Sequence, residues 1–460
     1  MSTDHVELRP GAYADSVALL RVSRDVQGVP GVVTAQVAMA TALNVEVLGE
    51  MGFTVPAGAT TNDLVVAVRL APDGDLATAL AAVELALTPV RADSEARAAE
   101  PRRTTATALL DGPALALVSV PGASAFVEAM DALDAGCDVM VFSDHVPVEQ
   151  EVALKRTAAD RGLLVMGPDC GTAVVGGVGL GFANATRPGP VGIVAASGTG
   201  CQQLLALLDH AGVGVTSALG VGGRDLSAEV GGLATLEALR RLDADDEVEL
   251  VVLVSKPPAP EVAARVEEYA AGLATPVALA LLGPDQQDLT AAAEAVLARL
   301  GLEVPSWPVS GHADPSGGGV VRGLFVGGTL CQEAALLCGE GGGHTFVDFG
   351  DDAFTQGRAH PMIDPTLRLD HLRQAAEDPA TGALLLDVVL GHGAEPDPTA
   401  LLAPTVRAAR PPVVVTVVGT RDDPQDRGRQ VAALVEAGAE VHLSNAAATR
   451  RALELAGGIR

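Results

Sequence analysis

Two short segments of this 460-residue chain repeat the same residue types in the same order. Gly198 to Gln202 reads Gly-Thr-Gly-Cys-Gln, and Gly328 to Gln332 reads Gly-Thr-Leu-Cys-Gln. Each segment follows an apolar run and opens a stretch of helical character. The first turn of a helix has N–H groups without intrahelical partners and about half a positive charge, so it can bind an anion. The repeat therefore predicts two halves of one phosphate-handling centre.

The elements that must position these segments are a strand before each segment and a helix after it. The apolar runs 191–196 and 323–326 predict the two strands. Either Ser197 or Thr199 could cap the first helix, which is worth about 1 kcal/mol. A capped turn without a ligand explains a single copy equally well, and the second copy favours a function. No GxxxxGK[ST] pattern occurs, so this is not a P-loop. The predicted phosphate-binding residues here are Ser197, Gly198, Thr199, Gly200, Gly327, Gly328 and Thr329.

A lysine and a glycine-rich loop follow the next strands along the chain. Lys256 stands after the aliphatic run 249–254, and Lys155 is the one other lysine of the sequence. Gly222 and Gly223 follow the run 215–219, where glycine lets a ligand approach the backbone closely. Lys256 is predicted as a catalytic cation and the two glycines as phosphate-binding residues. The alternatives are a solvated surface cation and an ordinary left-handed turn.

Three further loops carry residues that could do chemistry. The long segment 355–365 contains Arg358, which could bind a carboxylate or phosphate with its forked donors, and His360, which could act as an acid or base. A structural loop is the alternative there. His392 and the pair Asp169 and Cys170 are further site candidates in the loops 391–397 and 167–171. For the cysteines we favour packing over nucleophilic catalysis, and no group of residues has metal-ligand spacing, so no metal site is predicted.

The composition sets the class of protein. The chain is 48% hydrophobic with only 2% aromatic residues, which is typical of aliphatic parallel sheets in α/β proteins. A net charge of −28 argues against binding to nucleic acid or to an anionic membrane. Five cysteines without a CxxC pair indicate a reduced cytoplasm. The N-terminus lacks a signal-peptide pattern, and no apolar run is long enough to span a membrane.

Alternating strands and helices predict several α/β units with parallel, doubly wound sheets. We expect a small N-terminal α/β domain at 1–90 and further domains at 107–185, 188–302 and 321–460, with linkers at 89–106 and 305–319. In the first domain, 17–20, 32–37 and 64–68 read as strands and 76–87 as a helix. Strands are further predicted at 115–120, 139–142, 191–196, 215–219, 249–254, 277–282, 323–326, 344–349, 383–389 and 413–418.

The motifs together resemble those of NDP-forming acyl-CoA synthetases. Residues 167–171 are similar to the Gly-Pro-Asn-Cys segment of the succinyl-CoA synthetase α-subunit, 190–199 to its phosphate-helix entry, and 220–225 to its Gly-Ile-Gly-Gly-Asp loop. Residues 321–460 resemble the flavodoxin-like carboxyl domain of the β-subunit. The whole chain most resembles the FdrA family, which joins these pieces behind a different N-terminal domain. The resemblance implies a Rossmann-like CoA-binding-type domain at 107–185 and two flavodoxin-like ligase domains after it.

The sequence departs from the synthetases at the residues that carry phosphate. Residues 283–288 stand where those enzymes have a phosphorylated histidine, and they contain none; Gly311-His312-Ala313 lies in the linker and is not a convincing substitute. Lys256 falls opposite the glutamate that supports the phosphohistidine in the family. The chain has no room for an ATP-grasp domain, and the glycine-rich CoA loop is not evident.

Three functions remain open on this basis. The first is a transferase that holds carbamoyl phosphate, or another acyl phosphate, between the two helix ends; the FdrA resemblance implies a place in multi-subunit carbamoyltransferases of oxamate and ureide (allantoin) breakdown. The second is an NDP-forming acyl-CoA ligase subunit, with CoA or a nucleotide bound through a partner. The third is a non-catalytic scaffold. We expect a cytoplasmic oligomer with other protein subunits and without nucleic acid, membrane or certain cofactor.

Overall fold

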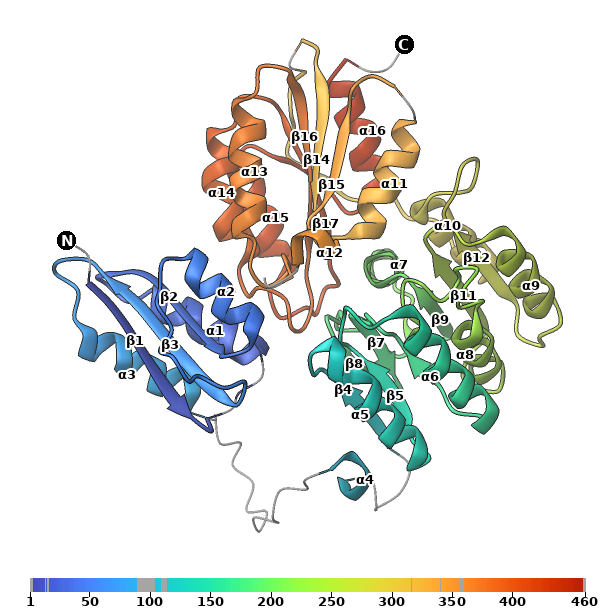
Figure 1. Cartoon of the computed structure of the whole chain (residues 1–460). Helices are drawn as coiled ribbons and strands as arrows, with labels where there is room; N and C mark the ends of the chain where they lie inside the picture. The colour runs from blue at the N-terminus through green and yellow to red at the C-terminus, as the bar shows by residue number, and fades with distance from the viewer. Residues whose placement is uncertain are drawn as a thin grey trace. The chain divides into compact units, whose positions relative to one another are not determined.

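The chain folds into two compact units, shown in the computed structural model of Figure 1. The first comprises Met1–Pro101 with Thr355–Ala359, and the second comprises Arg102–Phe354 with His360–Arg460. The structure describes residues 3–12, 14, 16–88, 104–108, 114–315, 317–339, 341–355 and 360–457. Most of the linker expected at 89–106 lies outside these residues. Among the described residues, no helix has both the length and the apolarity needed to cross a bilayer.

The first unit is a three-stranded antiparallel sheet covered by helices on both faces. Its strands are β1 (Thr3–Pro10), β2 (Val32–Met39) and β3 (Asp63–Leu70), in the order β1-β3-β2. Both outer strands run antiparallel to β3 and therefore parallel to each other, which is a split β-α-β arrangement. Its helices are α1 (Ser16–Gln27), α2 (Ala42–Glu50) and α3 (Leu76–Leu87).

Two expectations for this unit are wrong. The predicted strand 17–20 lies inside helix α1, because Leu19, Val22 and Val26 are buried at helical spacing along one face. The sheet is antiparallel rather than parallel, because β3 pairs between the two strands that α1 connects. The predicted helix 76–87 is confirmed as α3.

The second unit begins with a small parallel sheet. Strands β4 (Leu115–Val118), β5 (Asp138–Val141) and β6 (Val165–Met166) pair in chain order. Helices α5 (Gly122–Asp134) and α6 (Val148–Arg161) provide the crossovers, and the one-turn helix α4 (Thr105–Ala108) precedes them.

The next sheet has six strands in the order β12-β11-β9-β10-β7-β8. Its parallel strands are β9 (Val191–Ala196), β10 (Val215–Gly220), β11 (Leu250–Ser255) and β12 (Val277–Leu281). The hairpin of β7 (Thr172–Val175) and β8 (Val178–Gly181) joins the edge of β10, although it comes from the range expected to belong to the preceding domain. Helices α7 (Gly198–His210) and α10 (Leu289–Arg299) cover one face, and α8 (Leu233–Asp243) and α9 (Pro260–Ala271) cover the other.

The last sheet also has six strands, in the order β13-β18-β17-β16-β14-β15. Figure 1 shows α11 and α16 on one face and α13, α14 and α15 on the other. The expected parallel, doubly wound architecture is therefore confirmed for the second unit. Its elements are β13 (Val309–Ser310), β14 (Val320–Phe325), α11 (Gly328–Cys338), β15 (Thr345–Asp348), α12 (Asp352–Thr355), α13 (Thr366–Glu377), β16 (Thr381–Val389), α14 (Pro398–Ala408), β17 (Val413–Val418), α15 (Arg427–Glu436), β18 (Glu440–His442) and α16 (Asn445–Leu455).

The two six-stranded sheets share one hydrophobic core, which lies between α7 and α10 on one side and α11 and α16 on the other. Buried polar contacts cross this core with a pseudo-twofold relation. Gln203 Oε1, directly after the first repeat, accepts a hydrogen bond from the N–H of Asn445 at the start of α16 (3.2 Å). Glu333 Oε1, at the same position after the second repeat, accepts one from Leu289 at the start of α10 (2.6 Å). The residue directly after each repeat thus accepts a hydrogen bond from the N–H of the first residue of a helix in the opposite half.

Candidate functional site

The starts of α7 and α11 are in direct contact. Ser197 caps α7, since its Oγ accepts from the Gly200 N–H (3.0 Å), and it lies 2.6 Å from Thr329 Oγ1 of α11. A methyl group at Gly327 would lie 3.0 Å from the side chain of Thr199. Of the two capping candidates, Ser197 is therefore the cap of α7. The cap residue of α11 is Gly327, which supplies no side-chain hydrogen bond.

Free backbone donors remain at both helix starts. Among the described residues, no hydrogen-bond acceptor pairs with the N–H groups of Gly198, Thr199, Gly328 or Thr329. The N–H of Gly327 is not available, because it donates to Asp387. Two helix N-termini with unpaired donors at one point can hold one anion jointly.

A buried ion pair, absent from the sequence prediction, fixes the entry to α11. Asp387 of β16 accepts from the N–H groups of Val326 (2.8 Å) and Gly327 (2.9 Å). Arg368 of α13 donates to Asp387 Oδ1 (3.0 Å) and to the Leu324 carbonyl. Both side chains are buried, so loss of either one would leave an unpaired charge in the core. The signal that could have revealed Asp387 is a lone carboxylate inside the apolar run 383–389.

Lys256 and Asp348 lie against the same point of α11. A methyl group at Gly328 would lie 3.1 Å from Lys256 Nζ and 2.3 Å from Asp348 Oδ2. Only glycine therefore fits between these two charged groups. Within the described residues, Lys256 forms no ion pair closer than 4.0 Å, so its half-buried ammonium can accept an anionic ligand.

His360 and Asp348 both lie against Gly350. A methyl group at Gly350 would lie 2.8 Å from His360 Nε2 and 3.2 Å from Asp348 Oδ1. Burial lowers the pKa of His360 to about 4, so its ring is neutral at pH 7. Its Nδ1 accepts from the Met362 N–H (3.2 Å), which leaves the ring proton on Nε2. Arg358, predicted alongside it, lies outside the described residues.

The glycine loop after β10 is held by Lys155, whose role the sequence did not indicate. Lys155 Nζ donates to the Val221 carbonyl (2.8 Å), to Asp225 (2.8 Å) and to Glu151 (2.6 Å), all of them buried. Gly222 has φ +90°, and a methyl group there would lie 2.7 Å from the Pro168 carbonyl oxygen. Lys155 thus fixes a loop that packs on the segment 167–171, while Gly223 stays exposed.

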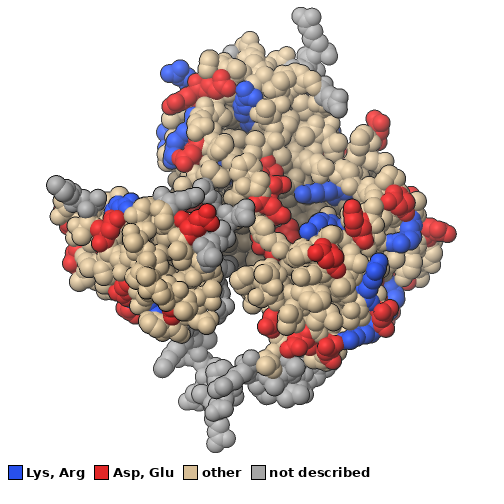
Figure 2. All heavy atoms as spheres, viewed as in Figure 1, with Lys and Arg blue, Asp and Glu red and all other residues tan. Residues whose placement is uncertain are grey.

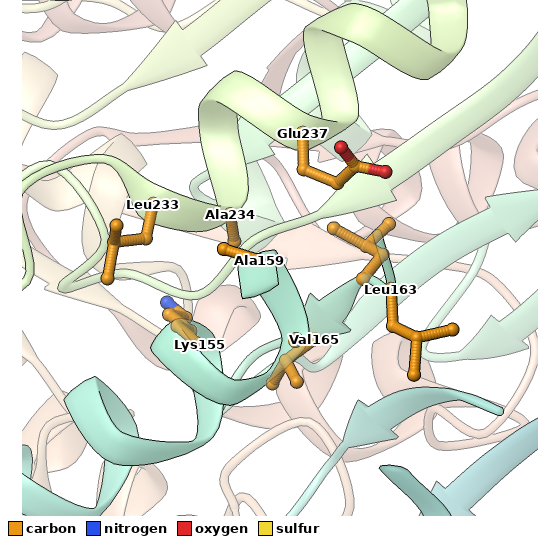
Figure 3. A pocket seen from close by; sticks show the side chains of 9 residues that line it. Lys155, Ala159, Leu163, Val165, Leu233, Ala234 and Glu237 are labelled. Atoms are coloured by element: carbon orange, nitrogen blue, oxygen red, sulfur yellow. The ribbon is translucent and has the colours of Figure 1, made fainter. Parts of the chain in front are cut away.

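Figure 3 shows Lys155 beside a pocket lined by Leu163, Val165 and Leu233. The hollow has no space that a water molecule can occupy. Of the two lysines, Lys155 is therefore structural, and Lys256 is the one that faces the helix ends.

Asp169 and Cys170 have different surroundings although they are adjacent. Burial raises the pKa of the Cys170 thiol to about 12, and Sγ donates to the Thr172 carbonyl (3.5 Å). Cys201 is buried in the same way, so these thiols pack rather than react. Asp169 is exposed, yet desolvation by neighbouring protein and the nearby Asp144 and Asp352 raise its pKa to about 6.

The fold brings together one group that sequence spacing could not show. Asp144, His145 and Asp352 place one ligand atom each within 4.8 Å of one another, and all three are exposed. Asp144 holds the pKa of His145 above its ordinary value. Asp144 and Asp352 lie close enough to Asp169 for their charges to act on it.

His392 and His312 stand apart from the helix ends. The His392 backbone N–H donates to the Ala183 carbonyl (2.8 Å), and its side chain is exposed. In the described part of the chain, no hydrogen bond or ion pair connects His392 with Lys256 or Asp348. His312 is exposed in the predicted linker, and its Nε2 lies 3.2 Å from Asp314 Oδ1.

On the face shown in Figure 2, basic side chains are scattered among acidic ones.

Comparison with known proteins gives this site a family context. Residues 324–455 match the family described as CoA-ligase, and residues 1–103 match the family described as AllF, heavy metal-associated domain. The matched N-terminal range contains none of the five cysteines. A solved structure of the dinucleotide-forming acetyl-coenzyme A synthetase 1 of Ca. Korarchaeum cryptofilum covers 75% of this chain and 85% of its own, at 16% identity and a TM-score of 0.29.

Two proteins with similar sequences match different shares of the chain. The ADP-forming succinate–CoA ligase subunit alpha of Staphylococcus aureus (strain Mu50) is 29% identical over 166 residues, or 35% of this chain and 51% of that subunit. The chain thus spans about half the length of that relative. The uncharacterized protein YahF of Escherichia coli (strain K12) is 39% identical over 455 residues, which cover 88% of this chain and 87% of YahF. The chain belongs to the FdrA family that YahF represents, within the NDP-forming acyl-CoA synthetase superfamily.

Proposed function

We propose that this chain is an acyl-transfer subunit that binds an acyl phosphate between the starts of α7 and α11. The observation that carries the proposal is the 2.6 Å contact of Ser197 and Thr329, which joins two helix N-termini whose free N–H groups face one site. Lys256 supplies the full positive charge at Gly328. Oriented N–H groups and a cation are what a leaving phosphate needs, because they stabilise the charge that develops on it.

CoA is the acceptor that the relatives favour. The carboxyl third of the chain matches a CoA-ligase family, and succinate–CoA ligase α-subunits match 35% of the chain. In this version, acyl phosphate and CoA give acyl-CoA and phosphate, and a partner subunit supplies the acyl phosphate from ATP. His360 does not replace the missing phosphohistidine, since the hydrogen bond from Met362 leaves Nε2 protonated and without a free lone pair.

Carbamoyl transfer is the second candidate, and the missing histidine at 283–288 favours it. Transfer from carbamoyl phosphate needs neither a phosphohistidine nor an ATP-grasp domain. The acceptor would be an amide or amine of the oxamate or ureide class, bound with the help of other subunits. Both candidates use the same phosphate site and differ in the acceptor.

Calorimetry with phosphate tests the proposed site, and transfer assays with two substrate pairs identify the acceptor. We expect inorganic phosphate to bind the full chain in calorimetry, and Lys256→Ala to weaken it by about 10-fold to 100-fold, since a charge-assisted hydrogen bond contributes about 1.5–3 kcal/mol. Arg156→Ala, which removes an equal charge from an exposed position of α6, is the control and should bind normally. Acetyl phosphate with CoA and carbamoyl phosphate with oxamate then separate the two acceptors. Absence of phosphate binding, or unchanged binding by Lys256→Ala, would overturn the proposal.

A further inference from the structure

Asp348 is a carboxylate at the point where Lys256 meets α11, since a methyl group at Gly328 would lie 2.3 Å from its Oδ2 and 3.1 Å from Lys256 Nζ. It ends β15, and its two oxygens have different surroundings. Oδ1 accepts from the Gly350 N–H (2.9 Å) and faces His360 Nε2 across Gly350. Oδ2 lies against Gly328, beside Lys256 Nζ, and has no hydrogen bond within the described residues. One oxygen is therefore fixed by the backbone while the other is free at the proposed phosphate site.

A free carboxylate oxygen is an unexpected neighbour for a phosphate. Its negative charge opposes the binding of a dianion, so it contributes nothing favourable to phosphate affinity. Acyl transfer, however, needs a proton acceptor at this place. Both candidate acceptors, a thiol and an amide or amine, must lose a proton when they attack the acyl carbon, and the base must lie within hydrogen-bond reach of that proton.

We propose that Asp348 is the general base of the transfer reaction, which rests on the proposed function of the site. The sulfur or nitrogen of the acceptor forms a bond to the acyl carbon, and the bond from that carbon to the phosphate oxygen breaks. The acceptor's proton passes to Asp348 Oδ2, and the electron pair of the broken bond leaves with the phosphate at Lys256 and the helix starts. Asp348 then returns the proton to solvent or to the departing phosphate, so the step needs no further reactant.

The charges around Asp348 suit this role. Burial raises its pKa to about 6, and Asp387 and Asp351 act in the same direction, while the Gly350 N–H and Lys256 oppose them. The group is therefore mostly ionised at pH 7 and yet more basic than an ordinary aspartate.

Two titratable neighbours of Asp348, the His360 ring and the Cys331 thiol, do not suit the role. Burial lowers the pKa of His360 and raises that of the Cys331 thiol, so the first is a weak base and the second is protonated at pH 7. His360 has its proton on Nε2, which allows it to donate a hydrogen bond but not to accept the proton. Of the three groups Asp348, His360 and Cys331, Asp348 is the one that is mostly ionised at pH 7.

Asp348→Asn tests the assignment, because asparagine keeps an acceptor for the Gly350 N–H and loses the base. We expect phosphate to bind at least as tightly as in the wild type, since a negative charge has been removed from beside it. With acetyl phosphate and CoA, kcat should fall about 10²-fold to 10⁴-fold. With thionitrobenzoate, a thiol already ionised at pH 7, the fall should be less than about 10-fold, because no proton remains to be removed. Asp370→Asn, at an exposed position of α13, is the control.

The outcomes separate this inference from the proposed function. Equal losses with CoA and thionitrobenzoate would assign Asp348 a structural role, and unchanged transfer to CoA would exclude it as the base. A wild-type chain that binds no phosphate would overturn the phosphate site itself. The pH profile adds an independent check: the wild-type rate should fall below about pH 6, and Asp348→Asn should lack this limb.

Discussion

Glu333→Gln should remove a pH-dependent weakness at the junction of the two six-stranded sheets. Glu333 is 1% exposed and accepts hydrogen bonds from Leu289 N–H and Asn445 Nδ2 (2.7 Å). Burial raises its pKa from 4.5 to about 7, and the two hydrogen bonds only partly offset this effect. The folded chain therefore holds a proton that the unfolded chain releases between about pH 4.5 and pH 7.

The sign and size of the effect follow from this difference. Where the folded state binds more protons, the free energy of unfolding falls as the pH rises. A pKa change from 4.5 to about 7 corresponds to about 3 kcal/mol lost between pH 4.5 and pH 7. Glutamine cannot ionise, so the variant should lack this slope. Its amide Nε2 would meet Asn445 Nδ2, which costs about 1 kcal/mol at every pH, so the net gain at pH 8 is about 2 kcal/mol.

The chain offers a convenient assay and a matched control. Its single tryptophan, Trp307, donates to Glu294 in the second unit, so fluorescence during urea unfolding follows that unit alone. Gln203→Glu places a carboxylate at the pseudo-twofold equivalent position and should introduce the slope that Glu333→Gln removes. Equal pH slopes in wild type and Glu333→Gln would refute the reasoning. A loss of stability of the same size at pH 5 and pH 8 would also refute it.

Two more substitutions test how the helix starts are held. Ser197→Ala removes the cap of α7 and a hydrogen bond to α11, so it should lower the free energy of unfolding by about 1–2 kcal/mol. Thr199 caps no helix, so Thr199→Ala should change the free energy of unfolding by less than about 0.5 kcal/mol. A larger effect of Thr199→Ala would contradict the assigned cap. Asp387→Asn leaves the Arg368 charge buried without its partner and should lower the free energy of unfolding by about 3–5 kcal/mol in the same urea assay. A loss below about 1 kcal/mol would mean that Arg368 finds another partner.

The sequence predicted the strands of the second unit well because each is a short, nearly continuous aliphatic run. The predicted strands 191–196 and 413–418 coincide with β9 and β17. The run 17–20 is also aliphatic, but it is too short to distinguish a strand from a helical turn. Residues 17–20 are helical because Val22 and Val26, further along the chain, complete the buried face of α1.

The site was predicted in part, for a physical reason. Glycine and threonine after a strand have a local meaning, since they start a helix whose N–H groups are free. The roles of the charged residues around them cannot be predicted from local sequence, because Asp348, Asp387 and Arg368 contact the start of α11 from three other elements. The two lysines show the same limit. Lys155 lies within helix α6 and Lys256 follows strand β11, and only their contacts show that the first is structural and the second is at the helix starts.

Local sequence alone predicts two helix starts of one kind, because the Gly-Thr-x-Cys-Gln repeat and its preceding strands are local properties of the chain. It also carries the motifs of the family, without a histidine at 283–288. Only the tertiary structure decided that the two starts meet, with Ser197 against Thr329, and that Lys256 and Asp348 converge on Gly328. These contacts join residues from different sheets, and packing of α7 on α11 in a shared core brings them together.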